Sequence, residues 1–518
     1  MSKYLNYFLL LCSLTLFVAY QHIGIDRPLD WDEVSYSNAA KQGIVKNATE
    51  QNSLNIVDFV RVGRNKVGSN ASSNISNKNY DEETDPFKLR HFHPVLPVYY
   101  WSFFTNNDIQ KNNHQLRWSN VLLAVLFVVL LLVTFDRKLK NNPFSSFFFF
   151  FCISLLITST AFLESFSALN FHNFSLLAVC FYIFALMNYI ESPTKKNSYV
   201  LGTSIAGLIL TLETAPFIIL GSAFFVLVLG FRKVFDWRSV ARMIAIALLL
   251  LCVLWPGILF TGGPIKSWAM YVYRIFAVGN EEYSGVSAIS KWKDLFVENL
   301  FFFLVVLAIF LVALRSFSDK KQRLALLPFF TGIFYALMMT PFMINHSYTL
   351  PAFGILLTGV FYWLTNSGIS EKAKHSKTNW VLIVVAMHAL YIAGRAITLN
   401  WQKTKSEVVQ KQNDFYEDVR EIQTHKSDKT LFIDGAHVMR YYLVMDEKQI
   451  INLELKSYKD PGFYQRVNFQ YISRETELEN KLFGVVALRR GFLSPEQEQK
   501  LQRFGYHEKV LHNYVIFY

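Results

Sequence analysis

Two adjacent carboxylates, Asp32 and Glu33, are the residues whose type and position most directly suggest chemistry. They lie in LDWDEVSYSNAAKQG (residues 29–43), immediately after the first apolar run. A carboxylate there can accept the proton of an attacking hydroxyl group or bind a metal ion. An adjacent acidic pair is more often only a solvated loop surface. Trp31 and Tyr36 favour a role at the membrane edge, because their amphipathic rings prefer the interface, where a carboxylate can approach a lipid-borne substrate.

A second polar group occurs in RHFHPVLPVYYWSFFT (residues 90–105). Arg90, His91 and His93 come directly before an aromatic segment and could contact an anion or a hydroxyl group. The alternative is a polar loop that turns into an interfacial helix, since prolines break regular structure and aromatic rings are enriched at headgroup level. The sequence leaves both interpretations open.

Two later stretches add candidate contacts for a lipid and its phosphate. In TPFMINHSYTLPAFGILL (residues 340–357), His346 and Tyr348 lie on a very short loop between two apolar runs. They could line a lipid site or only pack at the interface. Lys266 and Arg274 lie on a longer loop and are the cations that a lipid-phosphate headgroup would need, although such residues are more often ordinary surface charges.

The composition indicates that a polytopic membrane protein carries these groups. Of 518 residues, 52% are hydrophobic, 16% are aromatic and only 17% are charged, which is too apolar for an ordinary soluble domain. A helix needs about 20 residues to cross the hydrocarbon core. About eleven runs approach this length, the shortest being 199–212: residues 4–22, 118–135, 146–162, 174–190, 199–212, 217–231, 241–260, 295–314, 324–344, 348–365 and 380–399.

The basic residues lie where membrane topology would place them, so the net charge of +12 does not indicate a nucleic-acid partner. Lysine and arginine gather on alternate loops, which the positive-inside rule assigns to the cytoplasm. These loops are residues 136–140, 194–196, 231–242, 315–323 and 371–377. The amino terminus is then cytoplasmic, the first run is an uncleaved signal anchor, and Asp32 faces outward. Glu164 and Glu213 lie near outward ends of their runs, where they could reach water.

Three outward segments, residues 23–117, 261–294 and 400–518, are too long to be mere connections. We therefore divide the chain into a transmembrane domain (1–399) and a tail (400–518) of soluble composition. The tail has strand patterns at residues 430–435, 449–455, 483–490 and 513–518, and helix patterns at 436–444 and 494–505. The last helix has Ser494 as N-cap, Pro495 in its first turn and Gly505 as C-cap. These patterns predict a small α/β domain, extracytoplasmic because the number of spans is odd.

The chain resembles the GT-C superfamily of integral-membrane glycosyltransferases, and within it the protein O-mannosyltransferases and the bacterial aminoarabinose transferases that modify lipid A. WDEVSY is similar to the acidic motif of the first outward loop, HFHPVLPVYYW to the His/Lys-Pro-Pro-Leu segment of that loop, and HSYTLPAFGILL to a late His-x-Tyr-x-Leu-Pro segment. Val95 stands where the family often has a second proline. The tail does not resemble the β-trefoil of eukaryotic protein mannosyltransferases, which favours a bacterial-type enzyme in the inner membrane.

The resemblance implies an inverting transferase that moves a sugar from a polyprenyl-phosphate donor to an extracytoplasmic lipid, glycan or protein acceptor. Asp32 would contact the acceptor, as general base if the acceptor is a hydroxyl, and Glu33 would support it. The candidates for holding phosphate or orienting substrate are His93, His346, Lys266 and Arg274. The sequence leaves open the sugar, the acceptor and the use of a divalent metal ion.

Two other functions are compatible with a chain of this composition. A transporter or flippase for lipid-linked sugars would need charged or broken helices near the midplane, often in two similar halves, whereas the polar residues here concentrate at one face. A non-catalytic envelope assembly protein would tolerate replacement of the loop carboxylates. The four cysteines, Cys12, Cys152, Cys180 and Cys252, lie inside apolar runs with no CxxC spacing, so we expect no metal site from them.

Overall fold

The computed structural model of the chain describes residues 3–29, 31–49, 94–139, 143–259, 288–315, 317–340, 346–366, 387–389, 391–392, 394–395, 401–425, 430–433, 441–443, 450–453, 478–489 and 495–518. The chain divides into two compact units. The first consists of Met1–His22, Ala39–Thr105 and Gln115–Trp401, and the second of Ile23–Asn38, Asn106–His114 and Gln402–Tyr518.

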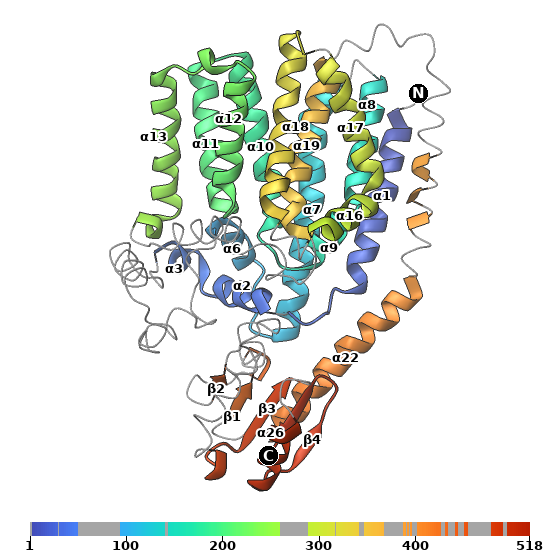
Figure 1. Cartoon of the computed structure of the whole chain (residues 1–518), viewed down its shortest axis with the longest axis vertical. Coiled ribbons are helices and arrows are strands. Elements are labelled where there is room, and N and C mark those ends of the chain that lie inside the picture. The colour runs from blue at the N-terminus through green and yellow to red at the C-terminus, as the bar shows by residue number, and fades with distance from the viewer. Residues whose placement is uncertain are drawn as a thin grey trace. The chain divides into compact units, whose positions relative to one another are not determined.

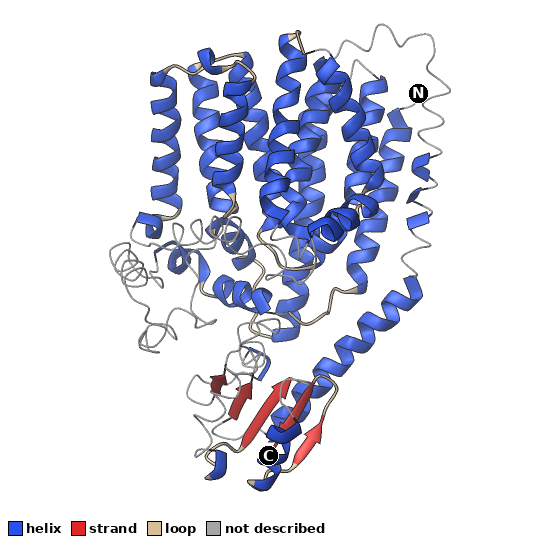
Figure 2. Cartoon of the chain, viewed as in Figure 1, coloured by secondary structure: helices blue, strands red, loops and turns tan. Residues whose placement is uncertain are grey.

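The first unit is a helical bundle (Figures 1 and 2). Its described helices are α1 (Lys3–Ile23), α3 (Gly43–Thr49), α6 (Val95–Ser102), α7 (Ile109–Leu139), α8 (Pro143–Ile157), α9 (Thr160–Ser167), α10 (His172–Glu191), α11 (Lys195–Thr211), α12 (Ala215–Val228), α13 (Trp237–Leu254), α16 (Ala288–Glu298), α17 (Leu300–Arg315), α18 (Lys320–Met339) and α19 (Leu350–Asn366). Short 3₁₀ helices are η1 (Arg232–Val234), η2 (Pro256–Leu259) and η5 (His346–Thr349).

Six of the described helices are long and apolar enough to cross a membrane: α1, α7, α10, α13, α18 and α19. The bent pair α8 and α9 adds a seventh if it is one span, and α12 and α17 are shorter apolar helices. The prediction of a polytopic helical membrane protein is therefore confirmed. The predicted run 380–399 falls largely outside the described residues, so the count of eleven spans stays a prediction.

Two runs that we predicted as single spans are each divided into two helices, so neither is one continuous helix. Run 146–162 divides into α8 and α9, which are bent by 53°. The break falls at Ser159, whose hydroxyl caps α9 by accepting a hydrogen bond from the Phe162 N–H. Run 295–314 divides at Asn299, between α16 and α17. Polar side chains at these points satisfy backbone groups that a helix end leaves free, which allows a break inside an apolar sequence.

Helices of the bundle approach closely where small residues face a neighbour. At Gly202 on α11, an added Cβ would lie 1.9 Å from the Ile246 side chain and 2.7 Å from the Met243 carbonyl oxygen on α13. No side chain larger than hydrogen fits there without displacing α13. Such packing of small residues is a usual way for membrane helices to associate.

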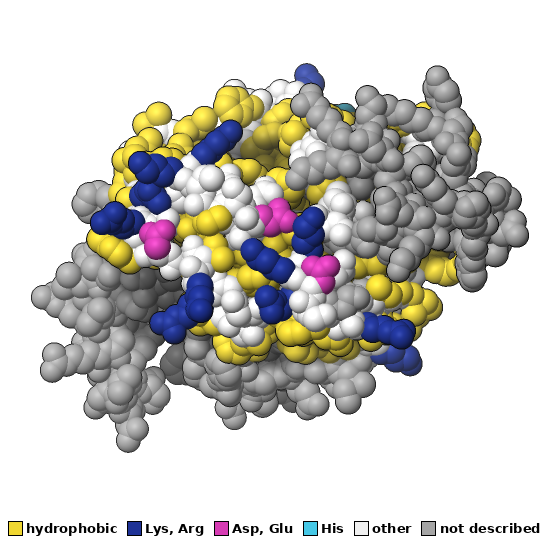
Figure 3. All heavy atoms as spheres, turned by 90° about the horizontal axis from the view of Figure 1, so that it is seen from above, with side chains coloured by type: hydrophobic (Ala, Val, Ile, Leu, Met, Phe, Trp, Pro, Cys, Tyr) yellow, Lys and Arg dark blue, Asp and Glu magenta, His cyan; other side chains and the backbone are white. Residues whose placement is uncertain are grey.

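The two ends of this bundle differ in charge and in structure. Basic side chains gather on the end shown in Figure 3, on the loops and helix termini that join α10 to α11, α12 to α13 and α17 to α18. They are Lys195, Lys196, Arg232, Lys233, Arg238, Arg242, Arg315, Lys320, Lys321 and Arg323. The short helices α3, α6, α9 and α16 lie at the other end of the bundle (Figure 1). The two ends of the bundle therefore differ in character.

The second unit contains α2 (Trp31–Lys41) up to Asn38, the first turns of α7, and the carboxyl-terminal domain. The domain has one sheet, in the order β2-β1-β3-β5-β4. Strands β1 (Thr430–Ile433), β2 (Ile450–Leu453) and β3 (Val485–Arg489) are parallel, whereas β5 (Tyr514–Phe517) is antiparallel to both β3 and β4 (Glu508–Val510). The helices are α22 (Trp401–His425) and α26 (Pro495–Arg503).

The predicted α/β tail is confirmed, because each of the four predicted strands is present. Gly505 follows α26 at φ +84°, as expected of a residue that ends a helix, and Ser494 lies outside the described residues. Within the predicted helix 436–444, only residues 441–443 are described, and they are helical. We did not predict α22 or the short strand β4, whose three residues are all exposed and carry no alternating pattern.

Candidate active site

Asp32 and Glu33 lie in the first turn of helix α2, not in an irregular loop. The Glu33 residue is only 7% exposed, and its Oε1 lies 3.7 Å from Nη2 of Arg27. A solvated loop surface is therefore the wrong interpretation for Glu33. The side chain of Asp32 lies outside the described part of the structure. A buried carboxylate needs compensating partners, so the burial of Glu33 beside a guanidinium indicates a structured site.

Asn112 at the start of α7 anchors the middle of α2. Asn112 is fully buried, and its Nδ2 donates a hydrogen bond to Oγ of Ser37 at 2.9 Å. Its Oδ1 accepts a hydrogen bond of 2.8 Å from the backbone N–H of Asn106. Nearby, His114 Nδ1 lies 2.7 Å from Oδ1 of Asp26. These contacts connect the segment that follows the first span to the start of the next one.

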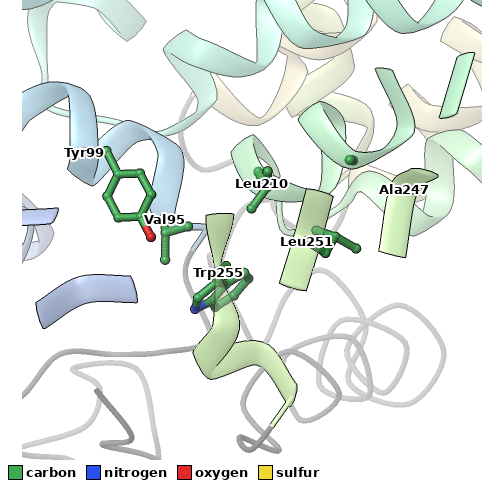
Figure 4. Close-up of a cluster of buried hydrophobic side chains, with 7 residues drawn as sticks. Val95, Tyr99, Leu210, Ala247, Leu251 and Trp255 are labelled. Atoms are coloured by element: carbon green, nitrogen blue, oxygen red, sulfur yellow. The ribbon is translucent and has the colours of Figure 1, made fainter. Parts of the chain in front are cut away.

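The helix that we predicted after residues 90–93 is present as α6. Val95 and Tyr99 on α6 pack with Leu210 on α11 and with Leu251 and Trp255 at the end of α13 (Figure 4). The Tyr99 hydroxyl also donates a 2.6 Å hydrogen bond to the carbonyl oxygen of Leu254. The apolar side of α6 thus covers the ends of α11 and α13. Arg90, His91 and His93 lie outside the described residues, so their proposed contacts stay predictions.

Tyr348 lies in the 3₁₀ helix η5, with its ring 4.5 Å from the ring of His172 at the start of α10. The neighbouring Ser347 is buried and accepts a 3.0 Å hydrogen bond from Nδ2 of Asn170. The side chain of His346 lies outside the described residues. The structure therefore brings Tyr348 together with His172, a buried histidine that the sequence analysis did not single out. The sequence feature that could have identified His172 is its position at the start of an apolar run, next to a short loop without Lys or Arg.

The two acidic residues of the apolar runs differ in exposure. Glu164 is exposed, as expected for a side chain that reaches water. Glu213 is only 6% exposed, so the expectation that it reaches water is wrong. The next residue, Thr214, is also buried and forms a 2.7 Å hydrogen bond with the hydroxyl of Tyr335 on α18. Glu213 therefore belongs to a packed polar junction between α11, α12 and α18.

An apolar cavity of about 430 Å³ lies among α16, α17, α18 and α19. Its lining is almost entirely aliphatic and aromatic: Trp292, Leu295, Phe296, Phe303, Val306, Leu307, Phe310, Phe329, Gly332, Ile333, Ala336, Leu337, Thr349, Ala352, Phe353 and Leu356. Thr349 belongs to η5, the segment that carries Tyr348. The cavity therefore extends toward the end of the bundle that carries η5, α6 and α9. A cavity of this size and lining suits a hydrocarbon chain.

The remaining candidates are not placed by the structure. Lys266 and Arg274 lie outside the described residues. In the described part of the chain, no group of three His, Cys, Asp or Glu side chains could hold a metal ion together. Glu33 and the start of α2 belong to the second unit, whereas α6, η5 and the apolar cavity belong to the first.

The fold is similar to those of three solved structures, each at 11–12% identity. ArnT from Cupriavidus metallidurans in the apo state has a TM-score of 0.59 and 11% identity, over 99% of this chain and 98% of that one. The same protein bound to undecaprenyl phosphate has a TM-score of 0.54 and 12% identity, over 99% and 97%. The archaeal oligosaccharyltransferase AglB from Archaeoglobus fulgidus, in complex with an inhibitory peptide and a dolichol-phosphate, has a TM-score of 0.51 and 11% identity, over 94% and 70%. No protein-family profile and no curated protein sequence matches the chain. At these identities the likeness establishes the fold.

Proposed function

We propose that the protein is a glycosyltransferase that takes a sugar from a polyprenyl-phosphate donor and transfers it, with inversion, to an acceptor on the extracytoplasmic side of the membrane. The observation that carries the proposal is the GT-C fold over almost the whole chain, with an acidic pair opening the first helix after the first span. Both solved relatives named above contain a lipid phosphate in one of their complexes.

The apolar cavity supports a lipid-linked donor. A polyprenyl chain is a long hydrocarbon, and transferring such a chain from water to an apolar groove is favourable by about 25 cal/mol per Å² of buried surface. Because η5 contributes Thr349 to the lining, a chain in the cavity would have its phosphate near the outward loops. Membrane lipids compete for any groove of this kind, so selectivity must come from the phosphate and the sugar. His93, His346, Lys266 and Arg274 are the residues that we assign to that headgroup, with Arg90, His91 and Tyr348 beside the substrate.

The transfer step follows from the chemistry of such a donor. The acceptor nucleophile attacks the anomeric carbon, the bond from that carbon to the phosphate oxygen breaks, and polyprenyl phosphate leaves with the bonding electron pair. If the acceptor is a hydroxyl, its proton passes to the carboxylate of Asp32, which acts as general base. Glu33 supports Asp32 from its buried position beside Arg27.

The charge asymmetry of the bundle supports the orientation. The positive-inside rule places the basic end shown in Figure 3 in the cytoplasm. Helices α6 and α9, together with η5, then lie on the outer side. Nucleotide sugars serve as donors in the cytoplasm, whereas a lipid-linked sugar serves as the donor on the outer side. We propose a bacterial inner membrane as the location.

Binding of undecaprenyl phosphate to the purified full-length chain in detergent tests the proposal. Native mass spectrometry would compare it with phosphatidic acid, which carries a similar charge on shorter tails. Ala336 lines the cavity, so Ala336→Trp should fill it and weaken undecaprenyl-phosphate binding at least tenfold, about 1.4 kcal/mol. Leu220→Trp is the matched control, because Leu220 is 67% exposed on α12 and does not line the cavity. Equal binding of both lipids, unaffected by Ala336→Trp, would contradict a polyprenyl-phosphate donor.

A further inference from the structure

A buried polar cluster in the second unit joins three segments that are far apart in the sequence. The first segment runs from Leu29, just before α2, to the middle of α2. The second is the first turns of α7, and the third is the helical residues 441–443 of the carboxyl-terminal domain. The members, each at most 8% exposed, are Leu29, Ser37, Asn112, Asn113, Tyr441 and Tyr442. We call the two tyrosines the tyrosine clamp. Their rings lie edge to face, with centroids 5.1 Å apart.

The hydroxyl of Tyr442 binds both backbone groups of Leu29. It accepts a 2.6 Å hydrogen bond from the Leu29 N–H and donates one of 3.2 Å to the Leu29 carbonyl oxygen. It also accepts a 3.0 Å hydrogen bond from Nδ2 of Asn113. A tyrosine hydroxyl has one donor and two acceptor positions, so every position is used. The residue two places before α2 is therefore held on both sides of its backbone.

The hydroxyl of Tyr441 is also fully engaged. It accepts from Nδ2 of Asn112 at 2.8 Å, donates to Oδ1 of Asn113 at 3.0 Å, and lies 3.3 Å from Oγ of Ser37 on α2. Burial raises the pKa of Tyr441 above its ordinary value, so the hydroxyl stays neutral and keeps its proton to donate. Asn112 bonds to Tyr441 and Asn113 bonds to both tyrosines, so the start of α7 is linked to both members of the clamp.

Helix α22 supports the clamp from within the carboxyl-terminal domain. The ring of Phe415 lies 4.9 Å from that of Tyr442 and the ring of Tyr416 lies 6.0 Å away, both in edge-to-face arrangement. Such aromatic pairs restrict a side chain to one orientation. A continuous set of contacts thus runs from α22 through Tyr442 to Leu29, three residues before Asp32.

We propose that the tyrosine clamp fixes the start of helix α2 and so positions Asp32 and Glu33 for transfer, which makes the carboxyl-terminal domain a working part of the active site. This inference rests on the proposed function. Tyr441 and Tyr442 act through α2 and are positioning residues. A catalytic carboxylate displaced by about 1 Å loses much of its effect, so loosening α2 should lower turnover before it affects donor binding.

The test removes one hydroxyl and keeps the ring. In Tyr442→Phe, the Leu29 N–H and Asn113 Nδ2 lose their acceptor, while the contacts with Phe415 and Tyr416 remain. Tyr506→Phe is the matched control: Tyr506 lies in the same domain, is 5% exposed, and donates a 3.0 Å hydrogen bond to the Phe483 carbonyl oxygen without contacting α2. Hydrogen–deuterium exchange of the full chain should be at least tenfold faster for amides 29–35 in Tyr442→Phe and unchanged there in Tyr506→Phe.

The same two variants are then compared in a transfer assay. Tyr442→Phe should lower kcat at least tenfold with KM for the lipid donor within about twofold, whereas Tyr506→Phe should keep both. Unchanged exchange in residues 29–35, or equal effects of the two variants, would overturn the proposal, as would faster exchange with an unchanged kcat. A wild-type chain without any transfer activity would instead overturn the proposed function and, with it, the positioning role. The exchange data would still decide whether the clamp holds α2.

Discussion

Asp418 on helix α22 holds the turn between the last two strands of the carboxyl-terminal domain. Its carboxylate accepts three hydrogen bonds: from the His512 N–H at 2.9 Å, from the Asn513 N–H at 2.7 Å, and from Nδ2 of Asn513 at 2.9 Å. The Asp418 residue is 1% exposed. Asp418→Ala would remove all three acceptors and detach the turn from the helix.

The size of the effect follows from these contacts. A hydrogen bond to a charged group contributes about 1.5–3 kcal/mol, and such contributions are not additive. The donors in the turn can bond to water in the variant, since the His512 side chain is 51% exposed. We therefore expect a loss of about 3 kcal/mol rather than the full sum. With a urea dependence of about 1.5 kcal/mol per molar, the unfolding midpoint of the domain should fall by about 2 M.

Pulse proteolysis of the intact chain across a urea series would measure this midpoint from the fraction of uncleaved carboxyl-terminal domain. Glu417→Ala provides the control, because Glu417 precedes Asp418 on the same helix and makes a surface contact of 3.2 Å with Nε2 of His512. An exposed pair of this kind contributes about 0–1 kcal/mol. A midpoint for Asp418→Ala as close to wild type as that of Glu417→Ala would refute the assignment of Asp418 as the anchor of the turn.

Three further predictions concern substrate, topology and pH. Lys266→Ala and Arg274→Ala should each weaken use of the lipid donor by about 1.5–3 kcal/mol and spare the acceptor, so an unchanged KM for the donor in both would contradict their role. A periplasmic-active reporter fused after Tyr518 should be active and a cytoplasmic one silent; the reverse would overturn the orientation. Hydrogen bonding from Lys509 holds the pKa of Glu421 below its ordinary value of 4.5, so this pair stabilises the domain above about pH 4.5. The stability difference between wild type and Glu421→Gln should therefore vanish as pH falls through the folded-state pKa, and a difference that persists in acid would contradict it.

The parts of the fold that depend on local pattern could be predicted from the sequence. Apolar runs marked spans such as α10 and α19, because a spanning helix must be apolar over its whole length. Alternating and short apolar runs marked β3 and β5, and the proline-aromatic stretch marked α6. In each case the signal lies within about 20 consecutive residues.

The features that depend on distant contacts could not be predicted. Tyr442 contacts Leu29 and Tyr441 contacts Ser37, in pairs more than 400 positions apart, and a single sequence carries no sign of such pairs. The break at Ser159 was hidden because serines and threonines in an apolar run are also common in an unbroken membrane helix. The acidic pair itself was found from its position, whereas its helical setting required the structure.

The measurement that tests the central claim most directly is turnover by Asp32→Asn. The asparagine has the size of the aspartate and can still form hydrogen bonds, but it cannot accept a proton at neutral pH. The assay would supply an extract of the source membranes that contains both the polyprenyl-phosphate sugars and the natural acceptors, and follow release of undecaprenyl phosphate by mass spectrometry, so that neither the sugar nor the acceptor need be identified. Asp108→Asn is the matched control, because Asp108 is exposed and caps α7 through a 2.9 Å hydrogen bond from the Lys111 N–H, which asparagine can also accept.

Loss of general-base assistance should lower the rate about 10²–10⁴-fold in Asp32→Asn, with normal membrane levels and normal binding of undecaprenyl phosphate. Glu33→Gln should lose less, and Asp108→Asn should match wild type. Wild-type turnover in Asp32→Asn would contradict the assignment of catalysis to the acidic pair at the start of α2.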